Sequence, residues 1–538
     1  MKMVARLWRG RKGQGTPEGS QARIVRNTLA NSGGTLVTVV VGLALSPFMI
    51  HRLGVEAYGV WILATTLSYG AGYLSFADFG FEQSAVRYIA EARAAGDERE
   101  MNRIWITIFA LLGGIALILT PPLILLAGPL VDLFGVPEEL RGEAVVAFSL
   151  VVGQLMIELP GRAFAAILAG AQRYGLLQLA RVVQTVLISG LVVVVLLAGE
   201  GIDWLGIVTF AGQCVTYALM AVLAVVGVSG VRFSPRLISR KAARKLAQFG
   251  GQLLVFQILG AIYRPMDKAI IGVALTASAV TTYEVGYKLF TGASFVQTLA
   301  TSTLIPTTAF TRHQPGRLRE MLLRGSSYVL ALGLPFVTAA FLFAEPLVRT
   351  WFGEALTDAA EPARLLLLAL IPTFPVAVGQ SMLMGLGVVR QMIWIVAAET
   401  VANISLSIVL VGPMGINGVV VATIVCAVVA FFPFAHLITR EIGVHPVEWT
   451  REVILPVLPG LAAQIACGLL LLPVADATGS LLVVAALCAV TVVVAMLVWV
   501  LLGLSSQRRQ ELFQAIRETA GRGEPMPEPD LAGDLPAP

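Results

Sequence analysis

Charged side chains are scarce in this sequence. Aspartate, glutamate, lysine and arginine make up only 13% of the 538 residues, whereas hydrophobic residues make up 57%. A soluble domain carries about 25% charged residues, so this composition excludes an ordinary soluble globular protein. The net charge of +5 does not indicate nucleic-acid binding, because the positive residues lie mostly in loops and at the chain ends. We therefore expect a polytopic membrane protein without a nucleic-acid partner.

Cysteine and histidine are rare too, with four of each. The cysteines lie in separate apolar segments without metal-ligand spacing, and we expect buried, inert thiols. The sequence lacks a G-x-x-x-x-G-K-[ST] phosphate loop, a catalytic triad and a cluster of metal-ligating residues. We therefore expect no metal, no cofactor and no enzymatic activity. A membrane glycosyltransferase or polymerase is the rival interpretation, and it would need a large loop with paired acids.

Long apolar runs are what the sequence does contain, and a bilayer-crossing helix needs about 20 such residues. Fourteen candidate spans lie at 27–50, 57–80, 104–127, 144–168, 177–198, 203–228, 247–273, 278–304, 324–344, 362–386, 391–411, 414–437, 453–473 and 480–503. With the N-terminus inside, the outer loops hold only Arg52, Arg141, Arg349 and Arg364 of the basic residues. This positive-inside pattern predicts an even number of spans, with both termini in the cytoplasm.

The segments between and beyond the spans differ in character. Residues 1–26 form a basic cytoplasmic segment, and residues 229–246 form a basic cytoplasmic linker. The stretch FEQSAVRYIAEARAAGDEREMNRI predicts an amphipathic helix that lies on the inner membrane surface. The C-terminal segment 505–538 ends in a polar, proline-rich stretch, so we expect a disordered cytoplasmic tail.

An internal repeat divides the spans into two sets. Gly33-Gly34 precedes Pro47 in the first span much as Gly250-Gly251 precedes Pro265 in the seventh. Further echoes link the fourth span to the tenth and the sixth to the twelfth. We therefore expect an N-terminal lobe at 27–228, a C-terminal lobe at 247–437 and two added spans at 438–504. Two such six-helix lobes, related by a pseudo-two-fold axis along the membrane normal, can rock about a shared cavity. Pro47 and Pro265 are the predicted hinges.

A family resemblance rests on two stretches. The segment LGVEAYGVWILATTLSYGAGYLSFADFGFEQSAVRYIAEARAAGD and the segment YEVGYKLF resemble signatures of bacterial polysaccharide flippases of the multidrug/oligosaccharidyl-lipid/polysaccharide exporter superfamily. The resemblance covers residues 25 to about 505. It implies a V-shaped all-α fold that flips an undecaprenyl-pyrophosphate-linked glycan to the outer leaflet, for polysaccharide or lipopolysaccharide (O-antigen) biosynthesis. Lipid II flippases share the length and the fourteen spans, so that branch of the superfamily stays open.

Several charges interrupt the seventh and eighth spans. Arg264, Asp267 and Lys268 lie in the seventh, whereas Glu284 and Lys288 lie four residues apart in the eighth. Each charge at a helix centre costs about 2.5–3.5 kcal/mol when it faces lipid, so we expect these side chains to face a polar space. One interpretation is a cationic cavity in which Arg264, Lys268 and Lys288 bind a pyrophosphate while Asp267 and Glu284 balance the charge. The alternative is a set of ion pairs that only fixes helix packing.

Four further charges are weaker candidates. Arg162 follows Glu158 in the fourth span and either binds substrate, with Glu158 as its balancing acid, or reaches to the cytoplasmic interface. For Asp78 we favour a structural capping role, and charge balance or coupling is the alternative. Glu399 is isolated in the eleventh span, where it either carries a coupling proton or makes a structural hydrogen bond.

Together these features predict a secondary transporter in the bacterial cytoplasmic membrane. We expect it to flip a polyprenyl-pyrophosphate-linked oligosaccharide by alternating access. Its partners would be the lipid-linked oligosaccharide and membrane lipids, with a polysaccharide polymerase as a further partner left open. The alternatives are a lipid II flippase for peptidoglycan and a multidrug or cation exporter of the same superfamily. An acidic cavity would favour the exporter, and the cationic excess of the seventh and eighth spans argues against it.

Overall fold

A computed structural model describes residues 37–38, 40–68, 72–301, 304, 308, 311, 313–511 and 514. The side chains of residues 249, 252–253, 255–257, 259–265 and 299–300 lie outside this description. The described chain is all α, as predicted, and contains no strand. Ten of its helices are long and apolar enough to cross a membrane, which makes the protein a multi-pass membrane protein.

The count of fourteen spans stays a prediction, because four predicted segments do not form such helices within the described residues. The first contains the shorter helix Val40–Leu53. The second is broken into α3 (Val55–Thr66) and the 3₁₀-helix η1 (Tyr73–Phe76). The other two fall in α11 (Arg240–Ala274) and α12 (Ala277–Thr301), whose charged residues lower the hydropathy.

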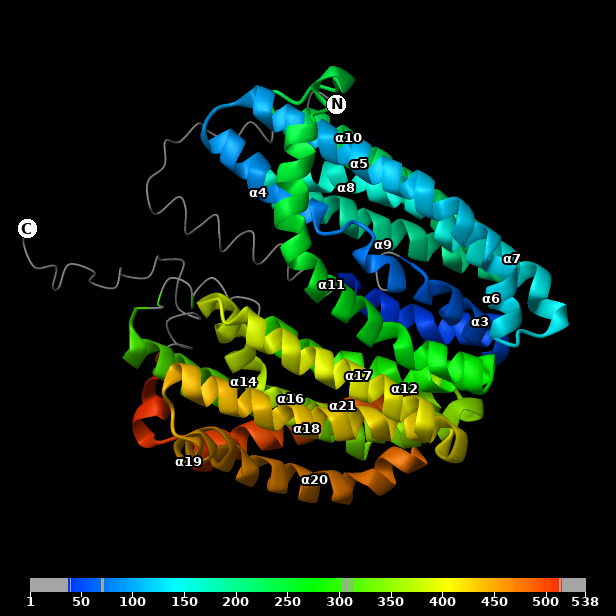
Figure 1. Ribbon diagram of the computed structural model, residues 1–538. Helices are drawn as coiled ribbons and strands as arrows, with labels where there is room; N and C mark the ends of the chain where they lie inside the picture. The colour runs from blue at the N-terminus through cyan, green and yellow to red at the C-terminus, as the bar shows by residue number, and fades with distance from the viewer. Residues whose placement is uncertain are drawn as a thin grey trace, which may run out of the picture.

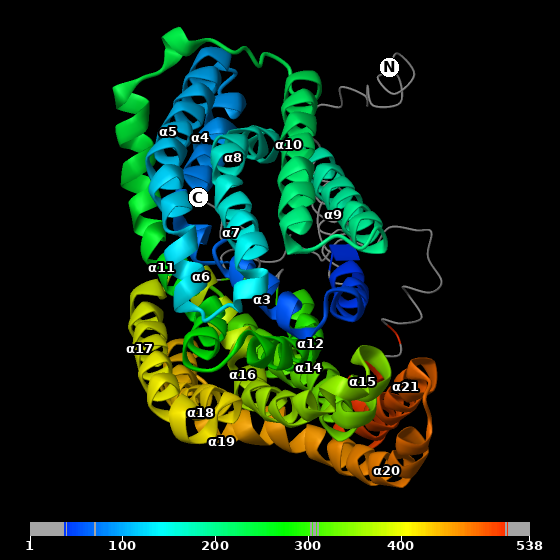
Figure 2. The ribbon, with the colours of Figure 1, turned by 90° about the vertical axis from the view of Figure 1, so that its right-hand side faces the viewer.

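The helices form two bundles, which Figures 1 and 2 show from two directions. The first bundle begins with helix 40–53 and α3. It continues with α4 (Phe81–Ala94), α5 (Glu98–Leu125), α6 (Ala127–Leu133), α7 (Glu138–Gly153), α8 (Leu155–Gly170), α9 (Tyr174–Leu197) and α10 (Ile202–Gly227). After α12, the second contains α14 (Pro315–Leu342), α15 (Ala344–Phe352), η3 (Glu354–Ala359), α16 (Ala360–Leu386), α17 (Val389–Met414) and α18 (Ile416–Ile442). It ends with α19 (Pro446–Trp449), η4 (Thr450–Ile454), η5 (Leu455–Val457), α20 (Leu458–Ala477), α21 (Leu481–Val498) and η6 (Trp499–Gly503).

The two bundles meet at one end and diverge towards the other (Figure 1). At the shared end α3 packs on α12, and the Thr281 hydroxyl donates to the carbonyl oxygen of Val55 at 2.6 Å. A Cβ atom on Gly59 would lie 1.9 Å from the carbonyl oxygen of Ala277, so this helix contact requires glycine. The diverging end carries the start of α5, the 228–239 connection and the start of α14 (Figure 1). The charge pattern predicts that these two helix starts and this connection lie on the cytoplasmic side.

The 35-residue helix α11 links the two bundles. At 1.5 Å per residue it is about 52 Å long. The Ser239 hydroxyl caps its first turn by accepting from the Ala242 amide at 3.5 Å. It packs on α4 and η1 on one side and on α12 and α17 of the second bundle on the other, and the Tyr73 hydroxyl of η1 lies 3.6 Å from the Met266 sulfur. Gly80 and Gly250 let α4 and α11 cross closely, because a Cβ atom on Gly80 would lie 2.6 Å from the Gly250 oxygen.

Two segments differ from the sequence-based expectations. The predicted surface helix forms as α4, but it packs along α5 and α8 inside the first bundle and buries Ser84, Ala85, Ile89 and Ala92. Its small side chains permit this close packing, so the surface location was wrong. The predicted disordered tail 505–538 begins with helical residues 506–511, so that part of the prediction was wrong as well.

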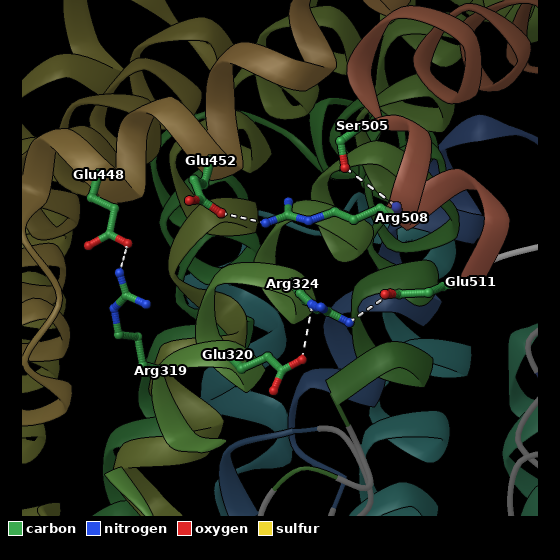
Figure 3. A network of polar contacts seen from close by, with 8 residues as sticks. All are labelled: Arg319, Glu320, Arg324, Glu448, Glu452, Ser505, Arg508 and Glu511. Carbon is green, nitrogen blue, oxygen red and sulfur yellow. Dashed lines mark hydrogen bonds and ion pairs between the residues drawn. The ribbon is translucent and has the colours of Figure 1, made fainter. Parts of the chain in front are cut away.

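Ion pairs explain why the start of the tail is ordered. Arg508 pairs with Glu452 of η4 at 2.6 Å, and Glu511 pairs with Arg324 of α14 at 3.0 Å. Arg319 pairs with Glu448 nearby, and Figure 3 shows these pairs side by side. The contacts fix the end of the last helix against the diverging end of the second bundle.

Candidate substrate site

The short connection between α11 and α12 brings their charged residues together. Only Leu275 and Thr276 separate the two helices, so α12 turns back along the last turns of α11. The Thr276 side chain accepts from the Ala279 amide at 3.1 Å and so caps the first turn of α12. Lys268 and Glu284 lie at similar distances along the chain from this turn and therefore face each other across the two antiparallel helices.

A lysine–glutamate–lysine cluster results. Lys268 Nζ lies 2.6 Å from one carboxylate oxygen of Glu284, and Lys288 Nζ lies 3.1 Å from the other. The Glu284 side chain is only 4% exposed, whereas those of Lys268 and Lys288 are 17% and 24% exposed. The carboxylate is thus more deeply buried than the two lysine side chains that contact it. The cluster carries a net charge of +1, and its partly exposed side chains are the two lysines.

Aromatic residues surround this cluster. Lys268 Nζ lies 4.9 Å from the centroid of the Tyr287 ring, a distance at which a cation and an aromatic face attract each other. Tyr58, on α3 of the other bundle, is 2% exposed and lies within electrostatic range of Lys288 and Glu284. The cluster therefore lies next to the contact between the two bundles.

Asp267 makes different contacts from those of the lysines. Its carboxylate accepts from the Tyr283 hydroxyl at 2.7 Å and from the Thr423 hydroxyl at 3.5 Å. Asn403 donates to Thr423 at 3.1 Å, which extends these contacts to α17. Asp267 therefore joins α11 to α12, α17 and α18 instead of touching a described lysine. Its predicted charge-balancing role stays a prediction.

The predicted residues Arg264 and Pro265 lie in α11, but their side chains fall outside the described residues. Pro47 lies within helix 40–53 and is partly buried. The hinge roles of Pro47 and Pro265 stay predictions.

The fourth-span candidates lie in the first bundle, apart from the lysine cluster. Arg162 pairs with Glu82 of α4 at 2.9 Å, and Glu158 accepts a hydrogen bond from Gln213 of α10 at 2.5 Å. Asp78 is 1% exposed and accepts from the backbone amides of Gly80 and Glu82, at 3.2 and 3.4 Å. These bonds cap the start of α4, so the structural role favoured for Asp78 is the one its contacts support.

Glu399 lies in a third place. It lines a cavity of about 750 Å³ between α17 and α18, where most of the other lining residues are apolar. Cys426, on the facing helix, lines the same cavity. The structure therefore does not bring Glu399 into the lysine cluster.

Sequence reasoning missed three contributors to these contacts. Tyr283 and Thr423 bind Asp267, and Glu82 binds Arg162. The sequence could have pointed to Tyr283, because it directly precedes Glu284 and shares a helix face with Tyr287, four residues later. Thr423 and Glu82 gave no such signal, since their partners lie on helices distant in sequence.

Comparison with known proteins adds an independent finding. The model of a family described as "Polysaccharide biosynthesis protein" matches residues 52–361. The putative O-antigen transporter of Shigella flexneri is 19% identical over 341 residues, which cover 62% of this chain and 77% of that protein. The probable low-salt glycan biosynthesis flippase Agl15 of Haloferax volcanii is 24% identical over 257 residues, which cover 46% of this chain but only 52% of that protein.

A solved structure supports the fold. The lipid II flippase MurJ, in an inward closed conformation, superimposes with a TM-score of 0.68 over 90% of this chain and 99% of that chain. The two sequences are 12% identical, so this similarity concerns the fold alone.

Proposed function

Since the chain belongs to the family of polysaccharide biosynthesis proteins, we propose that it flips a polyprenyl-pyrophosphate-linked oligosaccharide across a bacterial cytoplasmic membrane. In this proposal the glycan lipid moves from the inner to the outer leaflet by alternating access, and both chain termini are cytoplasmic. The names of the two relatives, an O-antigen transporter and a glycan flippase, support this substrate class.

The observation that carries the proposal is the Lys268–Glu284–Lys288 cluster. A lysine ammonium has three N–H donors, and each lysine directs one charged contact at Glu284. In this proposal the remaining N–H donors of the two lysines bind diphosphate oxygens while Glu284 holds the lysines in place. Without Glu284, an empty site would leave two uncompensated cations among apolar helices, which is costly.

A neighbouring cavity suits a lipid-linked phosphate better than a soluble one. Lys288 lines a cavity of about 280 Å³ together with Leu43, Phe336 and Trp351, and its other lining residues are almost all apolar. A phosphate held at Lys288 would have this apolar surface beside it for the first isoprene units. Burial of apolar surface would then add to the charge interaction.

The test is export of surface glycan in cells that lack this gene and carry variants of it. Lys288→Ala should abolish surface glycan and accumulate the lipid-linked precursor, whereas Lys288→Arg should retain part of the export because the charge survives. The matched control is Lys241→Ala, since Lys241 is exposed at the start of α11 and should export normally. Normal export by Lys288→Ala at wild-type membrane abundance would contradict the proposal. A block in peptidoglycan synthesis instead of surface glycan would assign the chain to lipid II.

A further inference from the structure

The first bundle contains a polar cavity that the lysine cluster does not share. Its volume is about 470 Å³, within the roughly 300–1,000 Å³ of small-ligand sites. Its lining comes from α8, α9, α10 and Thr38, and no described residue of α11 or α12 contributes. Most of its lining residues carry a side-chain amide, hydroxyl, carboxyl or guanidinium group, among them Gln178, Gln184, Gln213, Arg162, Arg181 and Tyr217.

A chain of hydrogen bonds fixes the direction of two of these amides. Gln213 donates from Nε2 to Glu158 at 2.5 Å, and Gln184 donates from Nε2 to the Gln213 carbonyl oxygen at 2.6 Å. Glu158 thus accepts from Gln213, and Gln213 accepts from Gln184, so each bond sets the direction of one amide. The carbonyl oxygen of Gln184 takes no part in this chain. The cavity is thus lined by two amides of defined orientation, on α9 and α10, and by the Glu158 carboxylate on α8.

The remaining wall is aromatic and cationic. A Cβ atom on Gly161 would lie 2.2 Å from the Tyr217 ring, so the glycine makes room for that ring beside α8. Arg162 is held by Glu82 at 2.9 Å, and Arg181 lines the cavity from α9. Oriented donors and acceptors beside an aromatic ring suit a ligand whose hydroxyl groups both donate and accept.

We propose that this cavity, which we term the amide pocket, binds sugar residues of the glycan. This inference rests on the proposed function, because it assigns a second part of the same substrate. A diphosphate suits the pocket less well than the lysine cluster, since Glu82 and Glu158 balance Arg162 and Arg181, whereas the lysine cluster has a net charge of +1. The substrate would therefore contact both bundles, with its diphosphate at α11–α12 and its sugar at α8–α10. Contacts that depend on the arrangement of the bundles allow a ligand to favour one arrangement over the other.

The experiment compares two probes on the purified full-length protein in lipid nanodiscs. One probe is undecaprenyl pyrophosphate, which carries no sugar. The other is the polyprenyl-pyrophosphate-linked oligosaccharide extracted from membranes of the cells that produce this chain. The variants are Gln184→Leu and Arg181→Ala, which change the pocket from α9. The matched control is Gln154→Leu, because Gln154 bonds to Thr209 and does not line the pocket.

Gln184→Leu should weaken binding of the glycan-bearing lipid by about tenfold, as expected for the loss of one or two hydrogen bonds, and leave undecaprenyl pyrophosphate unaffected. Arg181→Ala should act in the same direction, and Gln154→Leu should bind both probes like the wild type. Equal weakening of both probes, or wild-type binding of the glycan-bearing lipid by both pocket variants, would overturn this inference and leave the proposed function standing. A wild-type protein that binds neither probe would overturn the proposed function and this inference with it.

Discussion

Removing both lysines of the Lys268–Glu284–Lys288 cluster should leave Glu284 as a buried carboxylate without a counter-ion. The Glu284 side chain is 4% exposed, and both of its charged partners lie within 3.1 Å. Breaking a buried ion pair by deleting one partner costs about 3–5 kcal/mol. Here the lysines are partly exposed, so we expect the double variant Lys268→Ala/Lys288→Ala to lose about 3 kcal/mol. Each single variant should lose less than half of that, because Glu284 keeps one lysine.

Adding Glu284→Gln to the double variant separates folding from function. The neutral amide no longer needs a counter-ion, so the triple variant should recover about 2 kcal/mol of the loss. It should nevertheless fail to flip the glycan lipid, because the proposed phosphate-binding cations are gone. Stability restored without transport is the result that distinguishes a substrate site from a set of packing ion pairs.

Thermal unfolding in detergent, followed with a thiol-reactive fluorescent dye, measures the stability part. The four cysteines are partly or fully buried and are the same in every variant, so labelling reports unfolding on one scale. Export of surface glycan at matched membrane abundance measures the transport part. A triple variant no more stable than the double would refute the buried-charge argument. A triple variant that exports normally would refute the role of the lysines in transport.

Three further predictions follow from the arrangement of the helices. Reporter fusions after Ser229, Gln314 and Leu504 should all report the cytoplasm, and an outside signal at any of them would invalidate the charge-based topology. Gly59→Ala should destabilise the protein by about 1–3 kcal/mol, because its Cβ atom would overlap the Ala277 oxygen at 1.9 Å. The matched control is Gly114→Ala within α5, where a Cβ atom meets nothing within 4 Å, and it should not destabilise the protein. Deleting residues 522–538 should leave the unfolding temperature unchanged. Deleting residues 505–538 should lower it slightly, because this truncation removes the partly exposed Arg508–Glu452 and Arg324–Glu511 pairs, which contribute about 0.2–1 kcal/mol each. Equal unfolding temperatures for the two truncations would show that these pairs contribute nothing measurable.

The sequence predicted most of the helices but not their breaks. Apolar runs of sufficient length predict spanning helices from composition alone, because an unpaired backbone group in lipid is so costly. The break between α3 and α4 was missed, since residues 57–80 look as apolar as an intact span. Only the structure shows the turn there, with positive φ angles at Phe79 and Gly80. Likewise, the small residues of α4 gave no sign that it would pack between α5 and α8.

The candidate site divides in the same way. By itself the sequence predicted that Lys268, Glu284 and Lys288 would avoid lipid, because a charge at a helix centre is costly there. It also determined that Glu284 and Lys288, four residues apart, would share one face of a helix. Only the tertiary structure decided that Lys268 would pair with Glu284 and that Asp267 would bind Tyr283 and Thr423 instead. Hydrophobicity and helical periodicity act along the chain and can be recognised in it, whereas the partners of a buried polar group depend on how separate helices pack in space.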